Sequence, residues 1–284
     1  MYTILSLKII MKRVFLDIET SPNIALLWKA GYKINIPHDN IVKERAVVTM
    51  CWKTEHEKEV HNIDWDFNKI GRWREQNNNA DYRIVKKFAE IIEDADEIVG
   101  HNIDRFDFPW LKGRMMYHKI RGDVNVTTVD TLKWARKMGL NSGRLDYLGK
   151  YLFGQGKIST SWDLWVDIVL DKDQEALDYM VKYCKRDVLL LQEVYNELSY
   201  YAKPKTHVGV SLGSDRWSCP HCGSENMKKN MTRISAAGIR RHQMKCKSCG
   251  KHHQISDKVF KDYLEHKQLE KERKERKRNV VSKK

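Results

Sequence analysis

The stretch RVFLDIET at residues 13–20 begins with an apolar run of strand length, residues 13–18, and carries two acids near its end, Asp17 and Glu19. Their i, i+2 spacing directs both side chains to the same side of a strand. Two neighbouring carboxylates repel each other unless a cation lies between them or water surrounds them. The stretch therefore predicts either a metal site or a solvated end on the first strand of a sheet.

Two further acids stand in apolar surroundings. Asp107 lies in GHNIDRFDFP between Phe106 and Phe108, where it either faces a polar site or caps a helix N-terminus. Asp187 follows Tyr183 by four residues in a long helical pattern, so both side chains are expected on one inward face of that helix. A charge on an inward face is costly unless it is paired or bound to a metal. Asp187 is therefore a metal ligand, a member of an internal salt bridge or a partly exposed acid.

Strand and helix patterns follow each other through residues 1–200. Short runs enriched in Val, Thr, Trp and Ile predict strands, and apolar positions that recur on one helical face predict helices. The order, strands first and then a strand–helix alternation, predicts an α/β fold with a mixed sheet flanked by helices. The expected strands are residues 13–18, 47–53, 59–63, 97–99 and 125–129, and the expected helices are residues 81–93, 131–138, 145–153 and 174–198.

The three acidic motifs, taken together, resemble a known family. FLDIET, HN-x-x-x-FD and Y-x-x-x-D, in this order over residues 11–200, are similar to the three exonuclease motifs of the DEDD superfamily. More narrowly they resemble its Tyr-containing branch, close to the proofreading exonuclease domain of family B DNA polymerases. A sister branch places His five residues before the last Asp, where this chain has Lys182. The resemblance implies a ribonuclease-H-like fold and a free-standing 3′→5′ exonuclease of a type common in phage and prophage genomes.

The resemblance also implies roles for individual residues. Tyr183 would position the attacking water, Asn102 and Phe106 would line the substrate strand, and Thr20 would lie near the terminal nucleotide. The metal ligands that it implies are Asp17, Glu19, Asp107 and Asp187.

Elementary chemistry fits these roles. Carboxylate oxygens are hard ligands that suit Mg²⁺ or Mn²⁺. Two such ions about 3.5–4 Å apart can activate water and stabilise the leaving 3′-oxygen, so that nucleoside 5′-monophosphates are released. A tyrosine with an ordinary pKa of about 10 is a poor base at neutral pH. Its expected role is a hydrogen bond to the nucleophile.

The positive charge of the chain lies at its C-terminal end. Residues 1–200 contain 30 Lys and Arg and 30 Asp and Glu, whereas residues 201–284 contain 22 and 8, so the net charge of +14 arises entirely in the latter. A basic attachment suits a polyanion, although it can also be a solubilising tail. The expected organisation is an exonuclease domain at 11–202, a Pro-, Gly- and Ser-containing linker at 203–215, a zinc ribbon at 216–254 and a basic, helical tail at 255–284.

Four of the six cysteines form two C-x-x-C pairs, each followed by glycine. This pattern in a chain without a convincing signal peptide predicts one structural Zn²⁺ rather than disulfides. His221, His252 and His253 are less suitable substitutes, and Cys51 and Cys184 are expected to be small buried residues. The expected zinc ligands are Cys219, Cys222, Cys246 and Cys249.

The basic insert between the cysteine pairs suits phosphate contacts, although a ribbon can equally dock a protein partner. The leading function is hydrolysis of single-stranded DNA from its 3′ end. A 3′→5′ exoribonuclease and a non-catalytic nucleic-acid or protein adaptor are the alternatives. The short apolar start is neither a signal peptide nor a membrane span, and Met11 is an alternative start. We expect a cytoplasmic protein, in the host cytoplasm if phage encoded.

Overall fold

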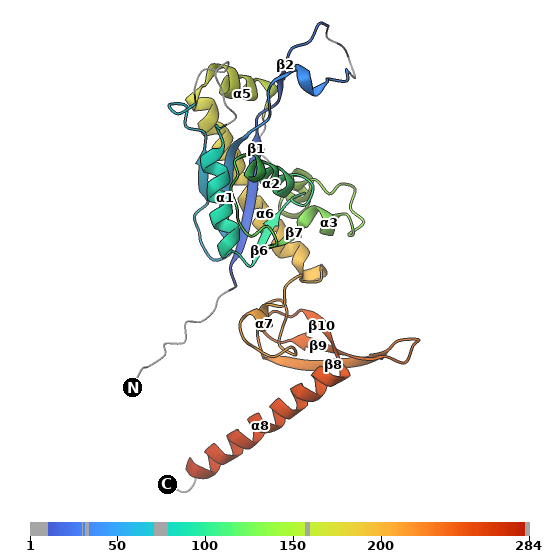
Figure 1. Ribbon diagram of the computed structural model, residues 1–284. Coiled ribbons are helices and arrows are strands. Elements are labelled where there is room, and N and C mark those ends of the chain that lie inside the picture. Colours follow the sequence, from blue (N-terminus) through green and yellow to red (C-terminus); the bar gives the residue numbers. More distant parts are fainter. Residues whose placement is uncertain (1–10, 30, 32–33, 71–78, 157–159, 282–284) are drawn as a thin grey trace, which may run out of the picture. The chain divides into compact units, whose positions relative to one another are not determined.

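A computed structural model describes residues 11–29, 31, 34–70, 79–156 and 160–281 of the chain (Figure 1). The chain divides into two compact units, an N-terminal unit of Lys12–Ala202 and a C-terminal unit that contains Lys203–Lys284. Each unit has its own buried hydrophobic residues. The two units are therefore described separately.

A five-stranded mixed sheet forms the centre of the N-terminal unit. Its strand order is β5-β4-β1-β6-β7, in which β1 pairs antiparallel with β4 and parallel with β6. The central position of β1 explains its continuous apolar run, because both of its faces are covered. The strands are β1 (Arg13–Thr20), β4 (Val47–Thr54), β5 (His61–Asp64), β6 (Glu97–Gly100) and β7 (Thr127–Asp130).

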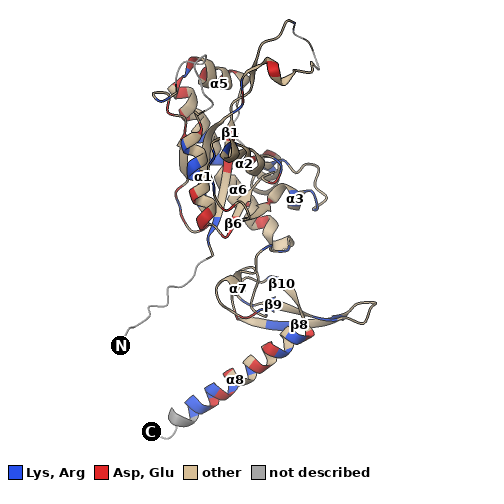
Figure 2. Ribbon diagram, viewed as in Figure 1, with Lys and Arg blue, Asp and Glu red and all other residues tan. Residues whose placement is uncertain are grey.

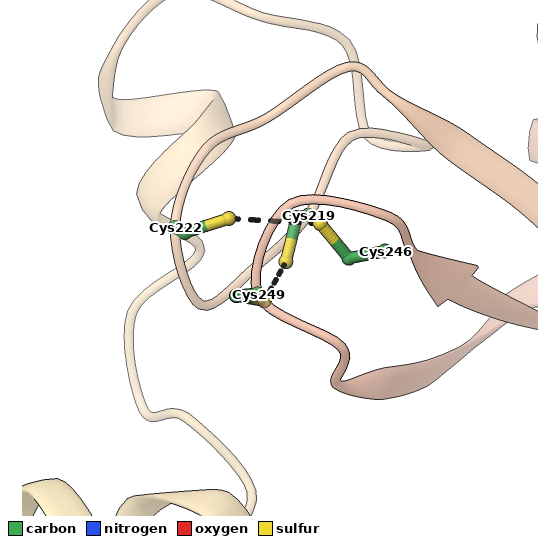
Figure 3. A group of neighbouring side chains, drawn as sticks. All are labelled: Cys219, Cys222, Cys246 and Cys249. Carbon is green, nitrogen blue, oxygen red and sulfur yellow. Dashed lines mark hydrogen bonds between the residues drawn. The ribbon is translucent and has the colours of Figure 1, made fainter.

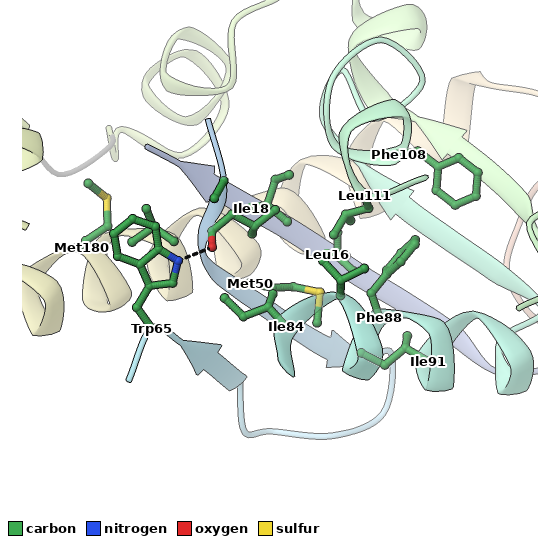
Figure 4. Close-up of a cluster of buried hydrophobic side chains, with 14 of the residues drawn as sticks. Leu16, Ile18, Met50, Trp65, Ile84, Phe88, Ile91, Phe108, Leu111 and Met180 are labelled. Carbon is green, nitrogen blue, oxygen red and sulfur yellow. Dashed lines mark hydrogen bonds between the residues drawn. The ribbon is translucent and has the colours of Figure 1, made fainter. Parts of the chain in front are cut away.

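Alternating residues of β1 face two different layers of helices. Leu16 and Ile18 pack with α1 (Tyr82–Asp94) and α2 (Asp107–Tyr117), and Figure 4 shows them beside Ile84, Phe88 and Leu111. Burying each of these side chains stabilises the fold by about 1.5–3 kcal/mol. The opposite side of β1 belongs to a second apolar cluster, with α6 (Gln174–Tyr201). The acids Asp17 and Glu19 lie on this second side.

Helix α6 runs through 28 residues and contacts β1, β4 and β5. Its start is capped by Asp173, whose side chain accepts a hydrogen bond from the backbone N–H of Glu175 at 2.8 Å. Cys184, Val188 and Leu191 on its inward face pack against the sheet. This packing against the sheet fixes how close the polar residues of α6 lie to β1.

Several elements differ from the sequence expectations. The strand expected at 59–63 begins only at His61, and the helix expected at 131–138 ends at Ala135, before Gly139 with its left-handed φ of 67°. The short elements were not predicted from the sequence, because a segment of two to five residues is too short to show a periodic pattern. The remaining elements of this unit are β2 (Ile24–Ala25), β3 (Ile41–Lys43), the 3-10 helix His38–Asn40, α3 (Thr131–Ala135), α4 (Leu145–Phe153), α5 (Trp162–Val166) and a π-helical segment at Asp167–Asp171.

The C-terminal unit is a small three-stranded antiparallel sheet with helices. Strands β8 (Met227–Ile234), β9 (Arg240–Cys246) and β10 (His252–Ser256) have the order β10-β9-β8. One face is covered by the first turns of α8 (Asp257–Val281), where Phe260 and Tyr263 join a core with Trp217. The Tyr263 hydroxyl donates a hydrogen bond to the Met227 carbonyl at 3.0 Å. The expected helical tail therefore begins as part of the folded unit.

The segment 203–215 is not a bare linker. It contains α7 (Val208–Ser211), and the Val208 N–H donates a hydrogen bond to the Pro220 carbonyl at 3.1 Å. The space beside Gly209 is filled by Ser218, so the segment packs closely on the first cysteine turn. A helix of four residues shows no periodicity in the sequence, and the Gly and Ser content favoured a linker instead.

Candidate active site and cysteine cluster

The end of β1 presents Asp17 and Glu19 on the side of the sheet that faces α6. Both side chains are half-buried. The parallel pairing with β6 includes Phe15 opposite Val99 and does not extend to these acids, whereas the pairing with β4 continues to Glu19 opposite Thr49. At its C-terminal end, β1 therefore pairs with β4 on one edge, and its other edge is open to groups that do not belong to β6.

Asp187 approaches the same place from α6. Its side chain is only 1% exposed, and one carboxylate oxygen each of Asp17, Glu19 and Asp187 lie within 4.8 Å of one another. Three negative charges at this separation repel strongly in a partly buried place. A bound cation removes that repulsion, and carboxylate oxygens at this spacing suit a hard divalent ion. The fold therefore brings together three of the four expected metal ligands.

Asp107 lies beside this group but is not one of the three. It begins α2, is 2% exposed, and its Oδ1 accepts a hydrogen bond from the backbone N–H of Ile18 at 3.2 Å. Ile18 stands between Asp17 and Glu19 in the strand. The hydrogen bond lies beyond the last pairing of β1 with β6, and it ties the carboxyl of Asp107 to the backbone between Asp17 and Glu19.

Tyr183 precedes Asp187 by one helical turn on α6. Its half-buried ring packs against the main apolar cluster of the N-terminal unit. Lys182, which stands where the sister branch has histidine, is exposed. The helix thus places the tyrosine and the aspartate on one stripe, as the four-residue spacing predicts.

The three residues expected to line the substrate are placed near the ends of β1 and β6. Thr20 is the last residue of β1, and its carbonyl accepts a hydrogen bond from Trp165 Nε1 at 3.1 Å. Asn102 has a left-handed φ of 70° and its N–H donates to Asp130 Oδ1 at 3.0 Å. Phe106 is half-buried and directly precedes Asp107. These hydrogen bonds fix the backbone at Thr20 and at Asn102.

The sequence of this unit matches a known protein family. Residues 59–199 match the family model described as the RNase_H superfamily. The N-terminal unit has a ribonuclease-H-like fold. The predicted α/β fold class is thereby confirmed, and the match supports nuclease activity and a nucleic-acid substrate for the ribonuclease-H-like domain.

Among solved structures, the family B DNA polymerase of the hyperthermophilic archaeon Pyrobaculum calidifontis is similar to this chain, with a TM-score of 0.48 and 15% sequence identity. The match covers 71% of this chain and 26% of the polymerase chain. No protein of curated function matches the sequence. Within the residues that the structure describes, no helix has the length and apolar composition needed to cross a membrane.

The sequence interpretation missed two groups that contact the candidate active site of the ribonuclease-H-like domain. Cys184 was expected only to fill the core, but its thiol is 3.5 Å from the Asp17 carbonyl and 3.7 Å from Asp17 Oδ2. Burial raises the pKa of the Cys184 thiol, so that it remains a neutral hydrogen-bond donor. Its position three residues before Asp187 on the helix was the available signal. Trp165, which binds Thr20, carried no such signal because it lies 145 residues away.

The four cysteines of the two C-x-x-C pairs converge in the C-terminal unit (Figure 3). Their sulfur atoms lie within 4.8 Å of one another, with Cys219 Sγ 3.6 Å from Cys249 Sγ and Cys222 Sγ 3.7 Å from Cys246 Sγ. A tetrahedral ion with Zn–S bonds of about 2.3 Å separates its sulfur ligands by about 3.8 Å. The arrangement therefore fits a zinc ribbon.

The backbone of each cysteine turn is also shaped for a metal. Gly223 and Gly250, which follow the second cysteine of each pair, have left-handed φ angles of 74° and 75°. Burial raises the pKa of the Cys246 thiol, but hydrogen bonds from the backbone N–H groups of Cys249 and Ser248 lower it, so that the pKa is about 7. Amide groups directed at sulfur favour the thiolate form that a metal requires. Of His221, His252 and His253, none belongs to this cluster as the structure describes it.

Proposed function

We propose that the chain is a metal-dependent 3′→5′ exonuclease that hydrolyses phosphodiester bonds from the 3′ end of single-stranded DNA. The observation that carries the proposal is the convergence of Asp17, Glu19 and Asp187 between β1 and α6. These residues are separated by up to 170 positions in the chain, and carboxylates held this close together are costly unless a cation binds them. A phosphate-cleaving site with divalent cations accounts for their proximity.

The four acids would hold two Mg²⁺ or Mn²⁺ ions, with Asp107 as the fourth ligand beside the group of three. When bound, such ions lower the pKa of a water and neutralise charge on the scissile phosphate. The protein positions the ligands. Asp107 is tied to β1 through Ile18, Asp17 receives the thiol hydrogen of Cys184, and Asp187 is fixed on a long helix.

Tyr183 would donate its phenolic hydrogen bond to the attacking water or to the phosphate. It stands one turn from Asp187 and is held by apolar packing on one side. Tyr183 is not one of the proposed metal ligands, so its contribution would be to orient the nucleophile. Thr20, Asn102 and Phe106 would hold the terminal nucleotides, and the 3′→5′ direction follows from the resemblance to the DEDD motifs.

The proposal is tested by digestion of 5′-labelled oligonucleotides of one sequence as DNA and as RNA, each with a free and a blocked 3′ end. With Mg²⁺ or Mn²⁺ we expect a ladder that shortens from the 3′ end of DNA, and release of nucleoside 5′-monophosphates. Blocking the 3′ end should stop the reaction. Faster digestion of RNA would indicate an exoribonuclease, internal cuts would contradict the exonuclease, and no cleavage with either metal would leave a non-catalytic adaptor.

A further inference from the structure

The three-stranded sheet of the C-terminal unit has two faces of different chemistry. One face is buried: Met227, Met244, Cys246 and Ile255 point into the core beneath α8. The pairing of β8 with β9 and β10 with β9 places the alternate residues on the other face. We call this second face the basic face. Its members are Lys228, Met231 and Arg233 of β8, Arg241, Gln243 and Lys245 of β9, and His252, Gln254 and Ser256 of β10.

A β-bulge brings the cations of β8 onto this one face. The register shifts between Lys229 and Met231, so Asn230 is the extra residue. Without it, Arg233 would point to the side opposite Lys228, because side chains alternate along a strand. The Asn230 side chain donates a hydrogen bond to Gln243 Oε1 at 3.3 Å, which holds the bulge in place.

The cations of the basic face stand opposite one another. Lys228 is directly across from Lys245, and Arg233 is directly across from Arg241. Like charges at such positions destabilise a sheet. All four side chains are exposed, and among the described residues none of the four has an ion pair with an acid. The sequence of the three strands contains no Asp or Glu.

The cations on the other face of the sheet have partners within the C-terminal unit. Lys229 lies with its Nζ 4.9 Å from the centre of the Phe260 ring, and Arg240 is 4.0 Å from Asp257. The unit therefore satisfies the basic residues of one face internally and leaves those of the other face for a partner. Because repulsion between the paired cations is relieved by a polyanion, the contrast favours an anionic occupant.

Helix α8 is a weaker candidate for the same occupant. Acids and bases alternate along it, as Figure 2 shows, and neighbouring side chains pair, as in Lys267 with Glu270 at 2.7 Å. A helix that neutralises much of its own charge releases fewer counterions on binding a polyanion. The basic face, by contrast, has only cations, amides, a histidine and a serine around Met231.

We propose that the basic face binds the sugar–phosphate backbone of a nucleic acid and raises the affinity for substrate without taking part in cleavage. From Arg241 to Lys245 the strand extends about 13 Å, so the two pairs of cations can contact different phosphates of one nucleic-acid strand. The amides of Gln243 and Gln254 lie between the two basic rows, where they can donate to phosphate and sugar oxygens. Backbone contacts of this kind bind without reading base sequence.

The test compares two full-length variants that each lose four positive charges from the C-terminal unit. One variant removes the cations of the basic face and the other removes exposed cations of α8. Both are compared with the unchanged protein for affinity to labelled DNA and RNA strands of one sequence, without added divalent metal, between about 50 and 200 mM salt. The face variant has Lys228→Gln, Arg233→Gln, Arg241→Gln and Lys245→Gln, and the α8 variant has Lys271→Gln, Arg273→Gln, Lys274→Gln and Lys277→Gln.

We expect the face variant to lose about tenfold or more in affinity at 100 mM salt. The dependence of log affinity on log salt should fall by about 0.7 for each phosphate of a single strand that the variant no longer neutralises. The α8 variant should change both quantities much less. Equal reductions of affinity in the two variants would overturn the proposal, because charge alone would then explain binding. Wild-type affinity of the face variant would also overturn it and leave the face for a protein partner.

Two controls keep the result interpretable. The face variant should retain zinc and its thermal unfolding midpoint, since it removes only repulsive pairs. If it loses zinc, the pair Arg233→Gln and Arg241→Gln alone should still lower the salt dependence. Binding is measured without cleavage, so a failure of the proposed exonuclease activity would leave the binding result unaffected. If the exonuclease activity is present, both variants should reach the wild-type rate at saturating substrate.

Discussion

The two candidate metal sites of this chain are built in opposite ways. The acids of the ribonuclease-H-like domain come from β1 and α6, with Asp107 beside them on α2, and a large apolar core holds these elements in place. The four cysteines lie within 31 residues, in a unit whose buried cluster has eight residues. In the first region the fold determines the site. In the second we expect the site to be a main source of the fold, because so small a core stabilises little by itself.

The largest expected effect is therefore loss of the cysteine cluster. Cys246→Ser should release the zinc and unfold the C-terminal unit, because structural zinc contributes about 10–16 kcal/mol in comparable small sites. The ribonuclease-H-like domain should keep its own cooperative unfolding transition. Metal analysis and calorimetry measure both. Ser248→Ala, an exposed neighbour between the two cysteines, is the matched control and should retain zinc. A C-terminal unit that stays folded without metal would contradict this difference between the two regions.

The next effect concerns the acids, whose loss should leave the fold intact. Asp187→Asn should lower the rate by about 10²- to 10⁴-fold, since each metal contributes several kcal/mol to stabilising the transition state. The unfolding temperature without metal should be unchanged or higher, because one of three repelling charges is removed. Asp178→Asn, an exposed acid on the same helix, is the control and should be fully active. A large fall in stability for Asp187→Asn would mean that the acid is structural.

A smaller effect is expected for the tyrosine. Tyr183→Phe should slow single-turnover cleavage by about tenfold, equivalent to one hydrogen bond of about 1.4 kcal/mol. Metal and DNA affinities should be retained because no ligand is lost. Tyr179→Phe makes the same change one turn earlier on α6, at an exposed position, and should have the wild-type rate. Equal rates for both variants would remove Tyr183 from the mechanism.

The smallest effect tests whether α6 is held by packing or by its own ends. Asp173→Ala removes the N-cap and should lower the free energy of unfolding of the ribonuclease-H-like domain by about 1 kcal/mol. Asp173→Asn keeps a capping oxygen and should be close to wild type. The cleavage rate at saturating substrate should be unchanged in both. A marked loss of activity in Asp173→Ala would show that the position of Asp187 depends on the helix end as well as on the core.

Much of both sites could be predicted from local rules. Alternation along a strand places Asp17 and Glu19 together, and helical periodicity places Tyr183 with Asp187. Two C-x-x-C turns with following glycines indicate a metal cluster because the ligand spacing is itself local. The strand–helix order likewise indicates the fold class, which the family match to residues 59–199 confirms.

Only the tertiary structure decided how distant segments meet. The sequence by itself determined which side chains share a strand side or a helix stripe, because these periods span only a few residues. It did not determine that Asp107 would bond to Ile18 across 89 positions, or that Cys184 would donate to Asp17. Nor did it determine that the bulge at Asn230 would gather the cations of one face. These contacts depend on strand register and on where β6 ends, which are set by packing of the whole core.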